Sequence, residues 1–380
     1  MLKKLILLFL VWRVALFIPL FVAQSIEYRQ GYPYTSPVYF LENKNSLISH
    51  FLISPWANFD GVYYLLIAAE GYTVNAGFFP LLPLSIYLAT SIFGNLLAFS
   101  PLQYFTALFQ VSLYFLTSLI LMYKLIRIDF SNKVALWSIV FMLIFPSSFF
   151  FVSIYSESLF LLLSVSAFYF ARKKRWLLAS LCGGLLTSTR LVGIAIIPAL
   201  IFEFVKQEKT LFKTKALSLL ITALGILGYM IFNLAKWGNA FYFIQAQGSF
   251  QNNRSVAAPV FLPQTLFRYI KIFLTVSPTH FEWFVALLEF SSFIFAVVML
   301  FVMWKKKIRL SYIIFALICF LIPISSGTFS ALPRYVLAMF PIFIALALVK
   351  NKLFKIAYSI VGFSLLMILL TLFSKGYFTA

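Results

Sequence analysis

The stretch LILLFLVWRVALFIPLFVA, residues 5–23, is an almost unbroken apolar run that follows two lysines. It is about as long as a helix that crosses a bilayer, which needs roughly 20 residues. Comparable runs recur along the chain. Since a backbone in lipid must satisfy its own hydrogen bonds, we expect each run to be a helix. The runs are continuous rather than alternating, unlike the strands of a membrane barrel. No clear cleavage site follows the first run, so it is predicted to remain as a span.

The composition leads to the same class of protein. Hydrophobic residues make up 63% of the chain and charged residues 11%, with a mean hydropathy of +0.98, which excludes an ordinary soluble domain. In a soluble protein the net charge of +20 would indicate nucleic-acid binding. Here the basic residues gather at the ends of apolar runs, as the positive-inside rule predicts, so no nucleic-acid partner is expected. Cys182 and Cys319 fall in apolar runs and indicate neither a disulfide framework nor a cysteine metal site.

The basic clusters predict the topology of a single all-α integral-membrane domain, residues 1–380. The clusters that should face the cytoplasm are Lys3 and Lys4, 124–133, 172–175, 206–215, 305–309 and 350–355. Between them we place about 11 spans. They lie near 5–23, 105–126, 134–152, 158–171, 216–235, 284–304, 310–324, 335–349 and 354–374, with two short passes in 176–205 that hinge near Arg190.

Two long segments, about 24–104 and 236–282, are predicted to lie outside the membrane. Within the first, residues 79–98 look long enough to span, but a span here would move the basic residues 124–133 outside. We therefore expect 79–98 to be a helix lying on, or dipping into, the outer leaflet. An ordinary span is the alternative, because the charge rule is a bias.

Asp60 is the main candidate for chemistry. It lies in the first external segment, in Trp56-Ala-Asn-Phe-Asp60-Gly61-Val-Tyr63-Tyr64, and is one of only ten acidic residues. Transfer of a sugar to an alcohol needs a base within hydrogen-bond reach of the hydroxyl, and Asp60 could be that base. Trp56, Tyr63 and Tyr64 could stack on sugar faces or anchor the segment at the interface. By position alone, Asp60 could also cap a helix that begins at Gly61.

Three further charged residues could join Asp60. Glu157 opens the span 158–171 and could face Asp60 across an external cavity, holding a sugar hydroxyl or, with Asp60, a divalent metal such as Mg or Mn. Acidic residues also favour helix N-termini for structural reasons. Arg190 and Arg334 lie in apolar stretches, where a planar guanidinium suits a phosphate. The structural alternatives are a salt bridge to a carboxylate for Arg190 and snorkelling to lipid headgroups for either arginine.

The second external segment gives weaker evidence for a functional site. It opens with Lys236 and holds Gln245, Gln247 and Arg254, a polar mixture that could contact the acceptor or form an ordinary solvated loop. The isolated residues expected at the surface are His50, His280 and Glu70. The chain has no phosphate-binding loop, dinucleotide fingerprint, zinc-protease motif or serine nucleophile elbow. Chemistry is therefore expected at the outer face and within the membrane.

Six stretches, in this order along the chain, resemble the PIG-V-like (GPI mannosyltransferase II-like) group of the GT-C glycosyltransferases. They are Asn58 to Tyr72, Phe78 to Pro83, Phe145 to Phe160, Arg175 to Gly193, Trp237 to Phe241, and Arg334 to Pro341. Each stretch alone is weak evidence for the resemblance. Six stretches in the same order as in the family are hard to obtain by chance. Phe59, Val62 with Tyr63, and Leu82 depart from the residues usual in the group, which leaves the exact sugar and acceptor open.

The resemblance implies a helical bundle whose long first external loop carries membrane-parallel helices. It also implies an inverting transfer of mannose from a polyprenyl-phosphate donor to a glycolipid or polysaccharide acceptor. The catalytic carboxylate of the group lies in the first external loop, which maps onto Asp60. Arg190 and Arg334 would then hold the donor phosphate, and Glu157 would position sugar or metal.

Two other classes of function stay open. A transporter or flippase of lipid-linked saccharides would also have many spans and embedded arginines. The long external loop and the lack of a convincing inverted repeat argue against it. A membrane scaffold is the third option. No eukaryotic retention signal is visible in residues 376–380, so a prokaryotic plasma membrane is favoured over an endoplasmic reticulum membrane.

Overall fold

The computed structural model describes residues 1–29, 52–73, 76–94, 97–209, 214–249, 255 and 258–379. Within these ranges every regular element is a helix, which confirms the predicted all-α class. His50, Arg254 and parts of both predicted external segments lie outside the described residues.

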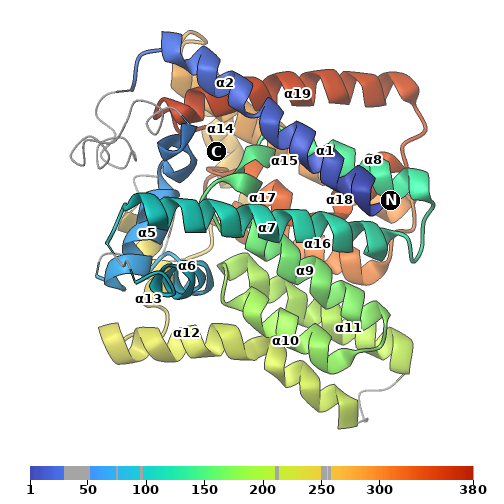
Figure 1. Cartoon of the computed structure of the whole chain (residues 1–380). Coiled ribbons are helices and arrows are strands. Elements are labelled where there is room, and N and C mark those ends of the chain that lie inside the picture. The colour runs from blue at the N-terminus through green and yellow to red at the C-terminus, as the bar shows by residue number, and fades with distance from the viewer. Residues whose placement is uncertain are drawn as a thin grey trace.

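Five helical stretches of the described chain are long and apolar enough to cross a membrane, and they match five of the predicted spans. The first is the continuous stretch Leu2–Ser25, made of α1 (Leu2–Ala15), α2 (Phe17–Val22) and η1 (Ala23–Ser25). The others are α7 (Pro101–Ile126), η5 (Thr214–Leu220) with α12 (Ile221–Trp237), α15 (Phe281–Lys305) and α19 (Lys352–Ser374). Figure 1 shows α1, α7 and α19 running along the same bundle. The protein is therefore a helical membrane protein, and the number of crossings stays a prediction.

Shorter helices complete the bundle, and two predicted spans are interrupted. The short helices are α8 (Asn132–Leu143), α9 (Glu157–Arg172), α10 (Trp176–Thr187), α11 (Ile196–Glu208), α16 (Leu310–Ile324), α17 (Leu332–Ala338) and α18 (Pro341–Ala347). The run predicted over 134–152 stops as a helix at Leu143, ahead of Pro146, and continues as η3 (Ser148–Val152). The run over 335–349 breaks before Pro341. Proline lacks the N–H that an unbroken helix needs, which explains both interruptions.

Residues 176–205, where two short passes were predicted, contain the two helices α10 and α11. The Trp176 indole N–H donates to Glu208 Oε1 at 3.2 Å, so the start of α10 lies beside the end of α11 and the two helices are antiparallel. Arg190 follows the end of α10 and directly precedes η4 (Leu191–Ala195), at the predicted hinge. On its other side α10 packs so closely on α12 that a Cβ added to Gly225 would lie 2.0 Å from the Gly184 carbonyl oxygen.

The end of the bundle at the left of Figure 1 carries helices from both predicted external segments. From the first come η2 (Ser54–Ala57), α5 (Asp60–Glu70) and α6 (Leu81–Ser91). At 11 residues, α6 is about 16 Å long, roughly half the hydrocarbon thickness of a bilayer. Figure 1 shows it nearly end-on beside α7. Whether residues 79–98 lie along the outer leaflet or cross it stays a prediction, like the number of crossings. The second segment contains α13 (Tyr242–Gln245), η6 (Ala246–Ser249) and α14 (Leu262–Thr275), which the sequence analysis did not predict.

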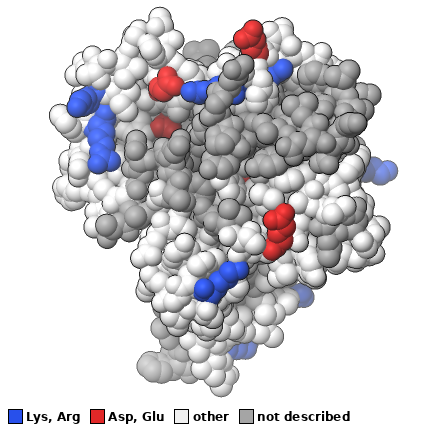
Figure 2. Space-filling model, turned by 90° about the vertical axis from the view of Figure 1, so that its left-hand side faces the viewer, with Lys and Arg blue, Asp and Glu red and all other residues white. Residues whose placement is uncertain are grey.

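The opposite end of the bundle gathers several of the basic clusters. The fully buried Glu203 accepts from Arg309 Nε at 2.7 and 2.9 Å, and from Ser311 Oγ at 2.6 Å. Arg172 pairs with Asp129 and approaches Glu203. Basic clusters that are far apart in the sequence therefore meet at one end of the bundle. This agrees with the prediction that they share one side of the membrane. Seen from the other end, the described surface shows only scattered charged side chains (Figure 2).

Candidate active site

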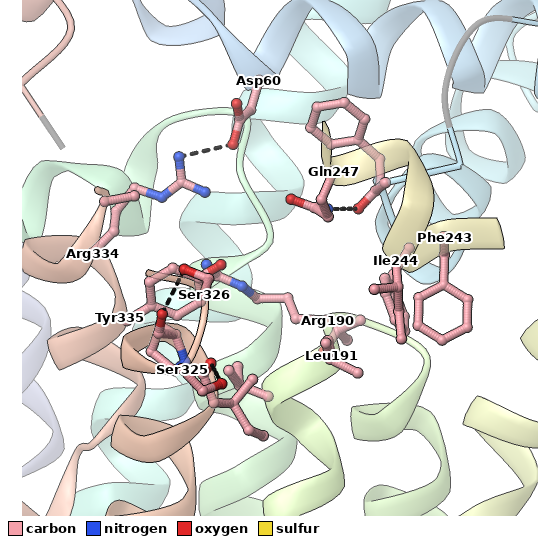
Figure 3. Close-up of a pocket in the computed structure, with 18 of the residues that line it drawn as sticks. Asp60, Arg190, Leu191, Phe243, Ile244, Gln247, Ser325, Ser326, Arg334 and Tyr335 are labelled. Atoms are coloured by element: carbon pink, nitrogen blue, oxygen red, sulfur yellow. Dashed lines mark hydrogen bonds and ion pairs between the residues drawn. The ribbon is translucent and has the colours of Figure 1, made fainter. Parts of the chain in front are cut away.

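A cavity of about 460 Å³ lies at the end of the bundle that carries α5 and α6. Its volume is within the range of small-molecule sites. Its wall is built from α5, η4, α13, α16 and α17, which come from distant parts of the chain (Figure 3). The polar residues in the wall include Asp60, Arg190, Gln247, Ser325, Ser326 and Arg334.

A strained turn places Asp60 at this cavity. Phe59, the residue before it, has φ +58°, a backbone region that costs energy for a residue other than glycine. The surrounding contacts hold the turn in place. Asn58 Nδ2 donates to the Phe373 carbonyl at 2.8 Å, and the Tyr155 hydroxyl donates to the Asn58 carbonyl at 2.7 Å. The same hydroxyl accepts from the Asp60 backbone N–H at 3.2 Å. Burial raises the pKa of Tyr155 well above its ordinary value, so the phenol stays protonated and able to donate.

The Asp60 side chain does not cap α5, so the capping alternative was wrong. Helix α5 begins at Asp60 itself, its N-cap residue is Phe59, and the cap makes no side-chain hydrogen bond. The carboxylate instead reaches Arg334, with Oδ2 at 2.8 Å from Nη1. The Asp60 side chain is 23% exposed, against 2% for Glu157. Of the two carboxylates, Asp60 is therefore the one that a substrate in the cavity can reach.

Glu157 lies behind the cavity wall and joins the two arginines. Its Oε1 accepts from Arg190 Nη1 at 2.5 Å and from Arg334 Nε at 2.9 Å. Its Oε2 is buried and has no hydrogen-bond partner among the described residues. Arg190 thus forms a salt bridge to a carboxylate, which the sequence analysis gave as the structural alternative to binding a phosphate. Arg334 is buried and paired inside the bundle, so it does not snorkel to lipid headgroups.

Aromatic rings fix the two guanidinium groups further. Arg190 lies 4.9 Å from the centre of the Tyr335 ring, and Arg334 lies 4.9 Å from that of Tyr155. Such cation–π contacts favour a charge that is held out of water. Figure 3 shows Arg334 at the left, near Asp60, and the Arg190 side chain extending toward it from the opposite direction, with Gln247 at the right. The charged groups therefore converge, and Gln247 adds a neutral polar group to the lining.

The other predicted site residues are divided between the cavity and the surrounding structure. Tyr64 lines the cavity, and its hydroxyl donates to Ser156 Oγ at 3.1 Å. Tyr63 does not line the cavity itself but stacks on Phe78, which does, with ring centres 4.8 Å apart. Trp56 is fully buried, with the Arg13 guanidinium 4.1 Å from its ring centre. Lys236 is exposed, above the Trp237 ring at the end of α12. The residues expected at the surface, Glu70 and His280, are exposed.

Tyr155, Tyr335 and Phe378 are among the cavity or support residues that were not predicted from the sequence. Tyr155 and Tyr335 lie beside Glu157 and Arg334 in the quoted stretches, so their proximity to charged residues was a usable signal. Phe378 also lines the cavity and packs against Phe59, with ring centres 5.4 Å apart. Nothing in the sequence links residue 378 to residue 59.

The residues present do not fit a divalent metal shared by Asp60 and Glu157. Among the described residues no three His, Cys, Asp or Glu side chains form a group able to hold a metal ion. Each of the two carboxylates also pairs with the guanidinium of Arg334, which takes the place that a bridging cation would need.

A comparison with protein-family models gives the identity. The model described as Mannosyltransferase (PIG-V) matches residues 2–207, more than half of the chain. The chain belongs to this family. The predicted PIG-V resemblance is confirmed, and the protein is a multi-pass membrane mannosyltransferase. In this PIG-V family member the matched part holds Asp60, Glu157 and Arg190, whereas Arg334 lies beyond it and joins the site through Glu157. No curated protein gives a significant match.

Proposed function

We propose that this PIG-V family mannosyltransferase takes mannose from a polyprenyl-phosphate donor. It passes the sugar, with inversion, to a hydroxyl of a glycolipid or polysaccharide at the outer face of a prokaryotic plasma membrane. One observation carries the proposal. A cavity-facing carboxylate, Asp60, lines the same cavity as two guanidinium groups, at the end of the bundle opposite the basic clusters. A base for a hydroxyl and a site for a phosphate are thus side by side.

The proposed reaction is a single displacement at the anomeric carbon. The acceptor hydroxyl donates a hydrogen bond to Asp60, and its oxygen attacks the anomeric carbon on the face opposite the phosphate. The carbon–oxygen bond to the acceptor forms as the bond to the phosphate oxygen breaks. The hydroxyl proton moves to Asp60, and the electron pair leaves with the polyprenyl phosphate.

The two arginines stabilise the charge that develops on the leaving phosphate. Their guanidinium groups are held by Glu157 and by aromatic rings, so they need little rearrangement when the charge appears. In this proposal Glu157 positions the arginines and does not bind sugar or metal.

The test is transfer of labelled mannose from polyprenyl-phosphate mannose to lipid or polysaccharide in membranes that carry the protein. Asp60→Asn should lower transfer by about 100-fold or more, because a general base contributes at least that much. Glu70→Gln is the matched control, since it removes an exposed carboxylate from the same helix. Equal transfer by wild type and Asp60→Asn would contradict the assignment of the base.

The same assay separates the enzyme from a flippase of lipid-linked saccharides. An enzyme forms a new covalent product that carries the label. If the label changes its side of the membrane but no new product forms, the transport alternative replaces the proposal.

A further inference from the structure

Helix α14 (Leu262–Thr275) presents three different surfaces along its whole length. Residues three, four and seven apart share a face of a helix, which sorts its side chains into three stripes. The first stripe is turned toward the protein and consists of Leu262, Thr265, Leu266, Tyr269, Ile272 and Phe273. The second is exposed and apolar, and consists of Phe267, Ile270 and Leu274, at 65%, 50% and 81% exposure. The third is exposed and polar, and consists of Gln264, Arg268, Lys271 and Thr275.

The inner stripe is firmly attached to the bundle. The Tyr269 hydroxyl donates to Glu289 Oε2 at 2.5 Å and accepts from the Phe329 N–H at 3.0 Å. Phe273 packs on Trp283 and Phe290 at the start of α15, with ring centres 5.7 and 5.6 Å apart. The three-way division of the surface therefore belongs to a fixed helix in a defined orientation.

A helix with these stripes suits a boundary where protein, hydrocarbon and water meet. At about 100° per residue, the centres of the three stripes are roughly 100–130° apart around the axis. One side meets protein, a second suits hydrocarbon and a third suits water. The polar stripe runs from residue 264 to residue 275, so no end of the helix is wholly apolar. A helix that crossed the bilayer would place part of that polar stripe at the membrane centre, which is costly.

We infer that α14 lies along the bilayer surface, at the end of the molecule that holds the cavity. Phe267, Ile270 and Leu274 enter the boundary between headgroups and acyl chains, as in other interfacial amphipathic helices. Arg268 and Lys271, on the polar stripe, face the lipid phosphates, and the partner of this surface is a phospholipid layer. The Arg268 Nη1 also donates to the Gly327 carbonyl at 2.8 Å, which fixes the polar stripe against the chain that follows α16.

The placement of α14 also sets the depth of the cavity. The chain that leads into α14 forms part of the cavity wall, with Pro259 in the lining. Two backbone hydrogen bonds attach this chain to the residues that follow α16. The Val260 N–H donates to the Ser325 carbonyl and the Ser255 N–H to the Ser326 carbonyl, each at 2.8 Å. A helix at the lipid surface would therefore hold this wall at headgroup depth, where the phosphate of a lipid-linked substrate lies.

The test is site-directed spin labelling of the full chain in phospholipid vesicles, after Cys182 and Cys319 have been replaced by alanine. Single cysteines at Phe267 and Leu274 report the apolar stripe, and single cysteines at Gln264 and Thr275 are the matched controls on the polar stripe. Collision with oxygen, which concentrates in lipid, is compared with collision with a water-soluble nickel chelate.

We expect spin labels at positions 267 and 274 to collide mainly with oxygen, and those at 264 and 275 to collide mainly with the nickel chelate. Nickel access at all four positions would place α14 in water and overturn the inference. Protection of 267 and 274 from both reagents would also overturn it, because the stripe would then be covered by protein, such as a second copy of the chain. The accessibility measurement does not depend on transfer activity. A failure of the proposed reaction would therefore leave this test of α14 unaffected.

Discussion

At the scale of single residues, the site depends on one arginine that serves two carboxylates. Arg334 donates to Glu157 through Nε, and its Nη1 meets Asp60 at 2.8 Å. A guanidinium is a rigid fork that can hold both partners at once, whereas an ammonium is a single point charge. The proposed base and the proposed phosphate site are therefore coupled through the shape of one side chain.

Arg334→Lys should consequently lose most of the transfer activity although it keeps the positive charge. We expect kcat/KM for mannose transfer to fall by about 100-fold, the usual effect of losing one aligned electrostatic group. Arg29→Lys is the control, because the Arg29–Glu282 pair is exposed and contributes little. Similar kinetics for the two variants would show that the fork geometry of Arg334 is not needed.

The Tyr155 hydroxyl offers a second test at this scale. Tyr155→Phe removes the bonds to the Asn58 carbonyl and the Asp60 N–H but keeps the ring beneath Arg334. We expect kcat to fall by about 10-fold with little change in KM, since a hydrogen bond contributes roughly 1 kcal/mol to holding the turn. Kinetics at several substrate concentrations separate the two constants.

The pH dependence of this variant has a defined sign. Burial raises the pKa of Tyr155, so the phenol of the wild type is neutral at every pH up to its ordinary pKa and beyond. The pH–rate profiles of wild type and Tyr155→Phe should therefore have the same shape below about pH 10. An alkaline limb that disappears in the variant would contradict this assignment.

At the scale of elements, the contact between α10 and α12 depends on glycine. A Cβ on Gly225 would lie 2.0 Å from the Gly184 carbonyl oxygen and 2.6 Å from Thr187 Oγ1. Both obstacles belong to α10, and one of them is backbone. A Cβ on Gly184 of α10 would likewise lie 2.6 Å from the Ile221 carbonyl oxygen of α12, so the close approach depends on glycine in both helices.

Gly225→Ala should therefore lower the free energy of unfolding by about 1–3 kcal/mol, the usual cost of overpacking. Gly228→Ala, one turn along the same helix, is the control because a Cβ there meets nothing within 4 Å. It should be neutral or slightly stabilising, since alanine favours a helix over glycine. Thermal unfolding in detergent measures both variants, and equal midpoints would rule out the close contact.

The sequence predicted the elements that have a strong local signal. The long spans were found because lipid contact requires a continuous apolar run, as in Phe281–Lys305. Asp60, Glu157, Arg190 and Arg334 were selected because charged groups in apolar surroundings need partners, and the structure brings these four together.

Other features left too little local signal to be predicted. Helix α14 was missed because its apolar residues are spread around two faces and form no run that resembles a span. The break before Pro341 was missed because proline is tolerated in membrane helices. The contact of Asn58 with the Phe373 carbonyl joins residues 315 positions apart, and a single sequence carries no periodicity for such a contact.

At the scale of the whole molecule, charged side chains form networks at both ends of the bundle. One contains Asp60 and the two site arginines, and the other centres on Glu203. The second network joins α11, α16 and the end of α9 at the end that carries the basic clusters. It has no part in the proposed reaction, so its contribution should be to stability.

Glu203→Gln should lower the free energy of unfolding by about 3 kcal/mol, because removing one partner of a buried pair leaves the other charge uncompensated. Arg309 and Arg172 would lose their shared carboxylate. The exposed Glu70→Gln variant is again the control, and thermal unfolding is the measurement. Equal stability of the two variants would mean that the network is dispensable.

The hydrogen bond from Asn58 to the Phe373 carbonyl has a consequence for how the protein is made. A ribosome adds roughly 5–20 residues per second, so the 315 residues between these partners take roughly 15–60 seconds to synthesise. During that time the turn before Asp60 has already left the ribosome but lacks its last support. The proposed base therefore gains this support only after α19 has been synthesised. A nascent chain that stops before α19 would hold the Asp60 turn without its hydrogen bond to residue 373.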